Sequence, residues 1–141
     1  MRALEAVVDT LVPDTDAGPG AAAMGVHRHV ADSIEAALPG FLEMLVMLLD
    51  AYAAGERPGA SFAELTPEER DRAFRAMAVE QSQDMRELVG ALFLFTFGGM
   101  YSEWSGRDRA NGELTPPWTW GHLGYRGPAT GHPGYRAKRP P

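Results

Sequence analysis

The sequence predicts an all-α fold, a bundle of about five helices followed by an extended, irregular C-terminal arm. Apolar residues recur at helical spacing up to about residue 101, and no stretch alternates apolar and polar residues as a strand would. Of the 40 residues at 102–141, 7 are glycine and 6 are proline, which opposes regular structure. We therefore expect one structural domain, with the bundle at residues 1–101 and the arm at residues 102–141.

The first two helices are expected to be amphipathic. The first ends at Pro13, and the turn-rich loop PDTDAGPG follows it. Its apolar face repeats at i, i+3 and i+4 and comprises Leu4, Val7, Val8, Leu11 and Val12. The second helix is expected to run from about residue 21 to residue 38, where Pro39 and Gly40 break it. Its inner face is expected to comprise Ala23, Val26, Val30, Ile34 and Ala37.

The third segment, GFLEMLVMLLDAY, is apolar nearly all round. Its only charged residues are Glu43 and Asp50. This pattern predicts a helix surrounded by other helices. Met44 and Met47 are accordingly expected in the core, together with Met77 and Met85 from later helices.

The fourth helix begins with the clearest local signal in the chain. Thr66 is expected to cap it, with Pro67 at the first helical position and Glu69 at the third, a capping box. The helix should extend to about residue 80. It should turn inward Phe74, Met77 and Ala78.

The fifth helix is expected at about residues 82–101. Its inner stripe is expected to comprise Met85, Leu88, Val89, Leu92, Phe93, Thr96 and Met100. Its second half, ALFLFTF, is apolar on every side. This indicates that something covers it.

Charge and composition narrow the classes of partner. The net charge is −6, made up of −9 over residues 1–101 and +3 over residues 102–141. An acidic body repels nucleic acid, so we expect no nucleic-acid partner. No apolar run approaches the roughly 20 residues of a membrane span, so none is expected. Without cysteine, the chain has no disulfide, thiolate metal site or cysteine nucleophile.

The sequence offers no convincing active site. His27 and His29 lie two apart on a helix and point to different sides, so they cannot bind one metal together. His122 and His132 have no carboxylate at ligand spacing. Asp14 is spaced from Asp16 like the start of a calcium loop, but the later ligands are missing, so a turn-forming role is expected. We expect no catalytic, cofactor-binding or metal-binding residue.

The arm is rich in aromatic residues, which is unusual for a Gly/Pro-rich segment. All three tryptophans lie in it. Such a segment is best interpreted as an ordered arm that lies on a partner, although packing on its own bundle remains the alternative. With the end of the last helix, the expected partner-binding residues are Phe95, Phe97, Tyr101, Trp104, Trp118, Trp120, Leu123, Tyr125 and Tyr135.

Three motifs in order resemble the gluconate 2-dehydrogenase subunit 3 family. The opening AVVDTLVPDTDAGPGAAAMGVHRHV is similar to the family's first helix, its "TLIP" turn and its Gly-Val helix. The connector "F-x-x-L-[ST]-P-E-x-R" is carried by Phe62, Leu65, Thr66, Pro67, Glu68 and Arg70. The closing "G-W-x-x-[IL]-G-[YF]-x-G-P" is carried by Trp120, Leu123, Gly124, Tyr125, Gly127 and Pro128.

The resemblance implies a small accessory subunit in a bacterial oxidoreductase complex. Its partner would be a large FAD-dependent enzyme of the glucose–methanol–choline class that oxidises a sugar or related alcohol. FAD would be bound by that partner and not by this chain, and a cytochrome would be a further partner as electron acceptor. The small subunit would assist folding, export or stability. Many members begin with a twin-arginine signal, which is not visible here. As written, the chain is expected in the cytoplasm, and in the periplasm if a signal has been removed.

Two other functions remain open at this stage. One is a free-standing helical module that binds a small apolar ligand. The other is a small enzyme whose histidines act in a cleft formed by the arm. Whether the chain has any enzymatic activity is left undecided, because the accessory role places the chemistry in the partner.

Overall fold

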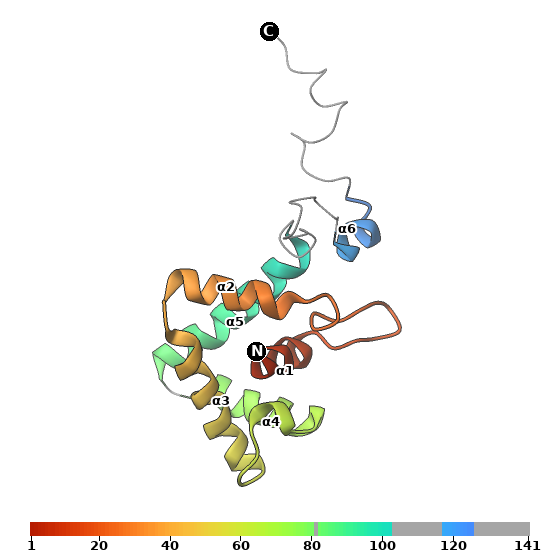
Figure 1. The fold of residues 1–141 in the computed structure, drawn as a ribbon. Helices are drawn as coiled ribbons and strands as arrows, with labels where there is room; N and C mark the ends of the chain where they lie inside the picture. Colours follow the sequence, from red (N-terminus) through yellow and green to blue (C-terminus); the bar gives the residue numbers. More distant parts are fainter. Residues whose placement is uncertain (81, 103–116, 126–141) are drawn as a thin grey trace, which may run out of the picture.

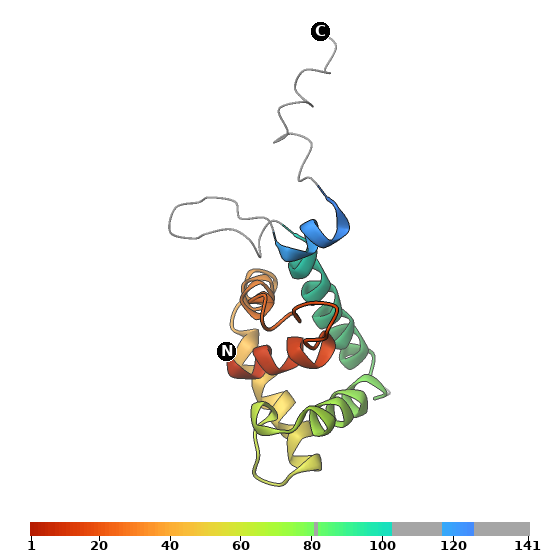
Figure 2. The ribbon, with the colours of Figure 1, turned by 90° about the vertical axis from the view of Figure 1, so that its right-hand side faces the viewer.

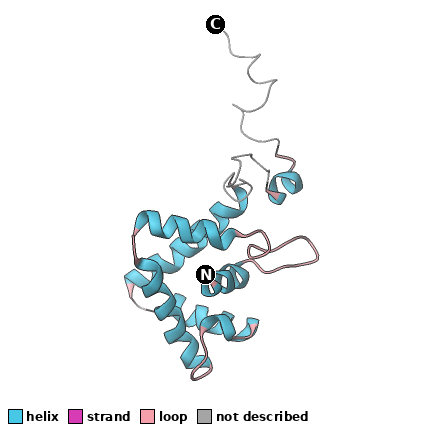
Figure 3. Ribbon diagram, in the orientation of Figure 1, coloured by secondary structure: helices cyan, strands magenta, loops and turns pink. Residues whose placement is uncertain are grey.

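The periodic stretches form helices in the computed structural model, which describes residues 1–80, 82–102 and 117–125. The all-α prediction is confirmed, since the described residues hold helices, turns and one isolated bridge between Thr15 and Gly18, and no strand (Figure 3). In chain order the helices are α1 (Arg2–Leu11), α2 (Val26–Ala37), α3 (Phe41–Glu56), the short 3-10 helix η1 (Phe62–Glu64), α4 (Pro67–Ala78), α5 (Gln83–Tyr101) and α6 (Trp118–Leu123).

The first helix, α1, lies inside the bundle. It packs against α2 and α5 on one side and against α3, η1 and α4 on the other (Figures 1 and 2). Leu4, Val7 and Val8 are buried, as the i, i+3, i+4 pattern predicts. Side chains from α1 to α5 therefore share one core around this helix.

The second helix begins at Val26, later than the sequence predicts. Residues 21–25 form turns that end at Gly25, whose φ of 73° is left-handed. An α-helix cannot continue through that conformation, which glycine adopts without strain. Ala23 and Ala37, predicted on the inner face, are exposed, while Val26, Val30 and Ile34 are buried as expected.

The third helix is not surrounded by others, which corrects the prediction. Leu45, Leu49 and Ala53 are buried at i, i+4 and i+8 against the bundle. The opposite face is open: Met44 is 57% exposed and Met47 is 73% exposed. The all-round apolar pattern marked a helix at the edge of the bundle, so the placement of these two methionines in the core was wrong.

The start of α4 has the predicted capping box. The Thr66 hydroxyl accepts a hydrogen bond from the backbone N–H of Glu69 at 3.3 Å, and the Glu69 carboxylate accepts the Thr66 N–H at 2.8 Å. Phe74 and Met77 are buried and Ala78 is partly buried, as expected. A second capping box, between Ser61 and Glu64, opens η1.

A glycine brings α2 and α5 into close contact. A Cβ added to Gly99 would lie 2.7 Å from Cδ2 of His29 and 2.8 Å from Cγ1 of Val26, so no larger residue fits between these helices. Val89, Leu92 and Thr96 are buried on the same side of α5. Phe93, predicted on that inner stripe, is 41% exposed, and its prediction as a core residue is corrected.

Candidate partner-binding surface

Large apolar side chains lie exposed along the outer face of α5. The rings of Phe93 and Phe97, one turn apart, are stacked with centroids 6.2 Å apart and planes at 8°. Tyr101 follows one turn later, and Leu94 beside them is 68% exposed. All the charged residues of α5 lie near its start, and the sequence from Leu88 to Tyr101 contains none. We call Phe93, Leu94, Phe97 and Tyr101 the apolar face of α5.

The short helix α6 caps the end of α5. The last carbonyl groups of any α-helix lack partners within the helix. Here the Thr119 hydroxyl donates to the Met100 carbonyl at 2.5 Å, and the Trp120 indole N–H donates to the Tyr101 carbonyl at 2.8 Å. Thr119 and Trp120 are both buried. These bonds fix α6 against α5 and correct the prediction that the whole arm is irregular.

The segment Trp120–Tyr125 ends α6 with a Schellman motif. Gly124 adopts φ 66°, the Tyr125 N–H donates to the Trp120 carbonyl at 2.8 Å, and the Gly124 N–H donates to the Gly121 carbonyl at 3.2 Å. The rings of Trp120 and Tyr125 meet edge-on with centroids 4.9 Å apart. That apolar contact commonly accompanies the motif. Gly124 and Tyr125, which directly follow WTWGHL in the sequence, therefore end the helix.

The loop at residues 12–20 forms the other wall of a groove beside α6. The Asp14 carboxylate accepts the Gly20 N–H, so the predicted turn-forming role of Asp14 is confirmed. Gly18 lies against the Trp118 ring so closely that an added Cβ would fall 2.3 Å from it. A mostly apolar hollow of about 380 Å³ lies between this loop, α5 and α6, and we call it the apolar groove. Its lining includes Val12, Pro13, Phe97, Tyr101, Trp118 and Leu123.

The structure brings together five of the nine predicted partner-binding residues. Phe97 and Tyr101 on α5 and Trp118, Leu123 and Tyr125 at α6 all expose large apolar surface. Two others are turned inward. Phe95 packs against the core, and Trp120 is 5% exposed, so neither offers its side chain to a partner in this arrangement. The remaining two, Trp104 and Tyr135, lie outside the described residues.

Sequence reasoning missed two members of this surface. Leu94 and Phe93 were not assigned to it, although both lie in the all-round apolar run ALFLFTF. Helical periodicity alone ranked Phe93 with the core, because it lies four residues after Val89, which is buried. The available sequence signal was the absence of any charged residue from Leu88 to Tyr101.

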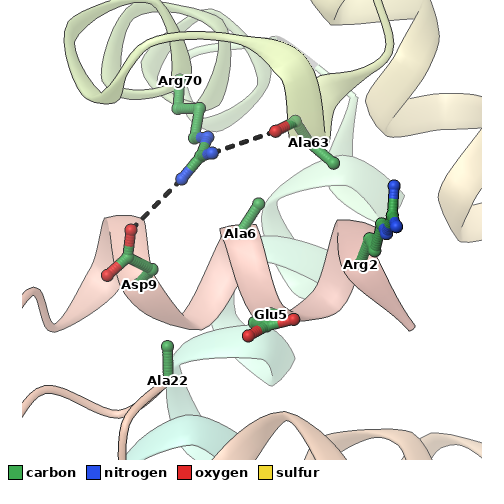
Figure 4. A pocket seen from close by; sticks show the side chains of 7 residues that line it. All are labelled: Arg2, Glu5, Ala6, Asp9, Ala22, Ala63 and Arg70. Atoms are coloured by element: carbon green, nitrogen blue, oxygen red, sulfur yellow. Dashed lines mark hydrogen bonds and ion pairs between the residues drawn. The ribbon is translucent and has the colours of Figure 1, made fainter.

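A second, polar hollow lies between α1 and α4 (Figure 4). Its volume is about 400 Å³, and its lining combines alanines with Arg2, Glu5, Asp9 and Arg70. The Arg70 guanidinium donates to the Asp9 carboxylate at 3.2 Å and to the Ala63 carbonyl at 3.0 Å. Arg70 thereby ties α1 to η1 and α4. We interpret it as a structural strut.

The described residues show no assembled metal centre. No group of three or more histidine, aspartate or glutamate side chains in residues 1–80, 82–102 and 117–125 could hold a metal. Burial lowers the pKa of both His27 and His29. His122 in α6 stacks on the Trp118 ring at 4.8 Å. Among the described helices, none is long and apolar enough to cross a membrane.

Comparison with known proteins gives one match. A family model described as gluconate 2-dehydrogenase subunit 3 matches residues 1–111. The first two of the three sequence motifs lie within the matched range, and the closing motif around α6 lies beyond it. No curated protein and no solved structure matches the chain.

Proposed function

Because the chain belongs to the gluconate 2-dehydrogenase subunit 3 family, we propose that it is a non-catalytic accessory subunit of a dehydrogenase complex. Its partner is a large FAD-dependent oxidoreductase of the glucose–methanol–choline class that acts on a sugar or related alcohol. The subunit binds and stabilises that enzyme, and FAD stays with the partner.

One observation supports this proposal above the others. The apolar face of α5 continues into the apolar groove, so that a single surface joins Phe93, Leu94, Phe97, Tyr101, Trp118 and Leu123. Large contiguous apolar patches are uncommon on monomeric proteins and mark sites of association. Aromatic side chains in particular dominate the energy of protein interfaces. The surface therefore suits a stable protein partner.

The proposal is tested by co-expressing the full chain with the large FAD-dependent oxidoreductase of the same organism and measuring the complex by size exclusion and titration. We expect co-elution and a defined affinity. Phe97→Ser, which removes a 43% exposed ring at the edge of the groove, should weaken binding by about 30-fold or more. The free energy of unfolding of the isolated subunit should change little by comparison.

Met47→Ser is the matched control. Met47 is a large, strongly exposed apolar residue on α3, away from the apolar face of α5. It should leave the affinity within about twofold of wild type, since residues outside an interface contribute little. If the two proteins elute separately, the accessory role is wrong. If Met47→Ser weakens binding and Phe97→Ser does not, the partner binds α3 instead.

The stabilising role needs its own measurement. The large enzyme produced without this chain should be less soluble, and its thermal midpoint should rise when the purified subunit is added in excess. Such a rise follows because a ligand that binds only the folded state stabilises it. Flavin content and turnover should follow the amount of folded enzyme. An unchanged midpoint at saturating subunit would contradict stabilisation.

A further inference from the structure

Next to the apolar groove lies another hollow, whose lining includes five charged side chains. Its volume is about 600 Å³, and it is lined by the N-terminal end of α4, the end of α1 and the start of the following loop. Pro13 belongs to the lining of both hollows, which therefore lie next to each other. The charged side chains that line this other hollow are four carboxylates and one guanidinium. We call it the acidic hollow, and its charged members are Asp9, Asp14, Glu68, Asp71 and Arg72.

Most charges of the acidic hollow are accounted for within the chain. Asp9 pairs with Arg70 at 3.2 Å and Asp71 with Arg75 at 2.8 Å, while Arg72 is held by Glu56 at 2.7 Å. The remaining two carboxylates differ. Asp14 accepts the backbone N–H of Gly20, and Glu68 has no hydrogen bond or ion pair within the described residues.

The charge of the acidic hollow that is not paired within the chain is therefore negative. The single lining cation, Arg72, is hydrogen-bonded to Glu56 and interacts with Glu68 only through space, so the carboxylates of the hollow remain in excess. Glu68 is exposed at the first turn of α4, and Asp14 follows Pro13 directly. A cationic side chain entering the hollow would gain attraction from both carboxylates. It would also lie next to the apolar groove, which Pro13 lines as well.

We propose that the partner's docking segment carries an apolar side chain that fills the apolar groove and a neighbouring arginine or lysine that enters the acidic hollow. This rests on the proposed function, because the occupant is a segment of the large subunit. The apolar part supplies most of the affinity, and the charge pair fixes orientation and accelerates encounter. Complementary charges at the rim of an interface act mainly on association rate and on specificity.

The test uses the full-length subunit and the large enzyme, with association followed at low and at high salt. Glu68→Arg should slow association by roughly tenfold at low salt and weaken the salt dependence. Glu43→Arg is the matched control. Glu43 is also an exposed glutamate in the first turn of its helix, α3, so both variants disturb the helix end alike. The control should leave the association rate within about twofold of wild type.

The chain also carries a basic segment of its own, with Arg136, Lys138 and Arg139. A full-length variant with these three residues changed to glutamine separates this source of positive charge from the partner. We expect Glu68→Arg to have the same effect on association in this background. If the effect disappears, the chain's own segment is the occupant and the proposal is wrong.

Three further results discriminate the remaining cases. A complex that forms with equal rates for Glu68→Arg and Glu43→Arg overturns this inference and leaves the accessory role standing. If no complex forms with the wild-type chain, the accessory role and this inference are both wrong. If the isolated subunit dimerises and Glu68→Arg abolishes the dimer, a second copy occupies the hollow, which also overturns the proposal.

Discussion

The two ends of the bundle are completed by different chemistry. At the α3–α4 end, polar side chains close the structure: two capping boxes, the Arg70 strut, and the Asp50 carboxylate that accepts the Phe62 N–H at 2.8 Å. At the α5–α6 end, apolar rings face outward along a helix stretch without charge. At the α3–α4 end, side chains of the chain itself satisfy backbone N–H and C=O groups. The other end leaves apolar surface that a second protein can bury.

This difference separates stability from binding. Substitutions at the α3–α4 end should lower the free energy of unfolding of the isolated chain without altering partner affinity once the chain is folded. Substitutions on the apolar face of α5 should do the reverse, because exposed rings contribute little to folding. The predictions below concern stability, in order of decreasing expected effect. Arg70 and Thr66 lie at the α3–α4 end, whereas Gly99 and the two histidines lie on α5 and α2.

Arg70→Ala should have the largest effect on stability. It removes the link to Asp9 and to the Ala63 carbonyl, and it leaves a carboxylate facing the polar hollow without its cation. We expect a loss of about 2–3 kcal/mol in the free energy of unfolding, measured by urea titration. Arg75→Ala, which breaks an exposed pair within α4, is the control and should change nothing measurable. Equal losses would show that Arg70 is no strut.

Gly99→Ala should follow. The added methyl meets His29 and Val26 at less than 3 Å, so the two helices must separate. Overpacking of this kind costs about 1–3 kcal/mol. Gly90→Ala, in the same helix with open space around it, should instead stabilise by about 0.5–1 kcal/mol. Chemical denaturation of the two variants measures the change in the free energy of unfolding for each. An increase for both would contradict close packing at Gly99.

Thr66→Ala should cost about 1 kcal/mol. It removes the hydroxyl that accepts the Glu69 N–H and leaves that donor to water. Thr66→Ser keeps the acceptor and should restore most of the loss. Thermal unfolding followed by circular dichroism distinguishes the two. Equal midpoints for alanine and serine would show that the cap contributes no stability.

The smallest effect is expected from pH. Burial holds the pKa of His27 and His29 below their usual 6.5. Below that value the unfolded chain binds more protons than the folded chain, so the free energy of unfolding decreases as pH falls. The thermal midpoint should drop between about pH 7.5 and pH 5.5. A variant with both histidines changed to glutamine should lose part of that drop, and an unchanged slope would exclude these groups as its source.

The sequence predicted the elements whose causes are local. The apolar repeat of α1 and the Thr66 capping box of α4 involve residues within one or two turns of each other, and both were confirmed. The start of α2 was missed because it depends on the left-handed conformation of Gly25, which composition does not reveal. An apolar repeat also does not show whether its residues are buried in the folded chain. Hence Met47 and Phe93 were misplaced in the core.

The candidate site was predicted in part for the same reason. Phe97, Tyr101, Trp118, Leu123 and Tyr125 were identified by their apolar character alone. The helix α6 was not, because a segment of only six residues, which includes a glycine, has little helix-forming tendency by itself. Their helix depends on bonds from Thr119 and Trp120 to carbonyls about twenty positions earlier in the chain. Such distant partners leave no periodic pattern.

The stacked pair of Trp118 and His122 gives this surface an intrinsic optical reporter. Trp118 is 44% exposed at the edge of the apolar groove, and the imidazole lies 4.8 Å from its ring. Indole emission moves to shorter wavelength when water is excluded from the ring. Arrival of a second protein at the groove should therefore be visible in the subunit's own fluorescence, without any attached dye.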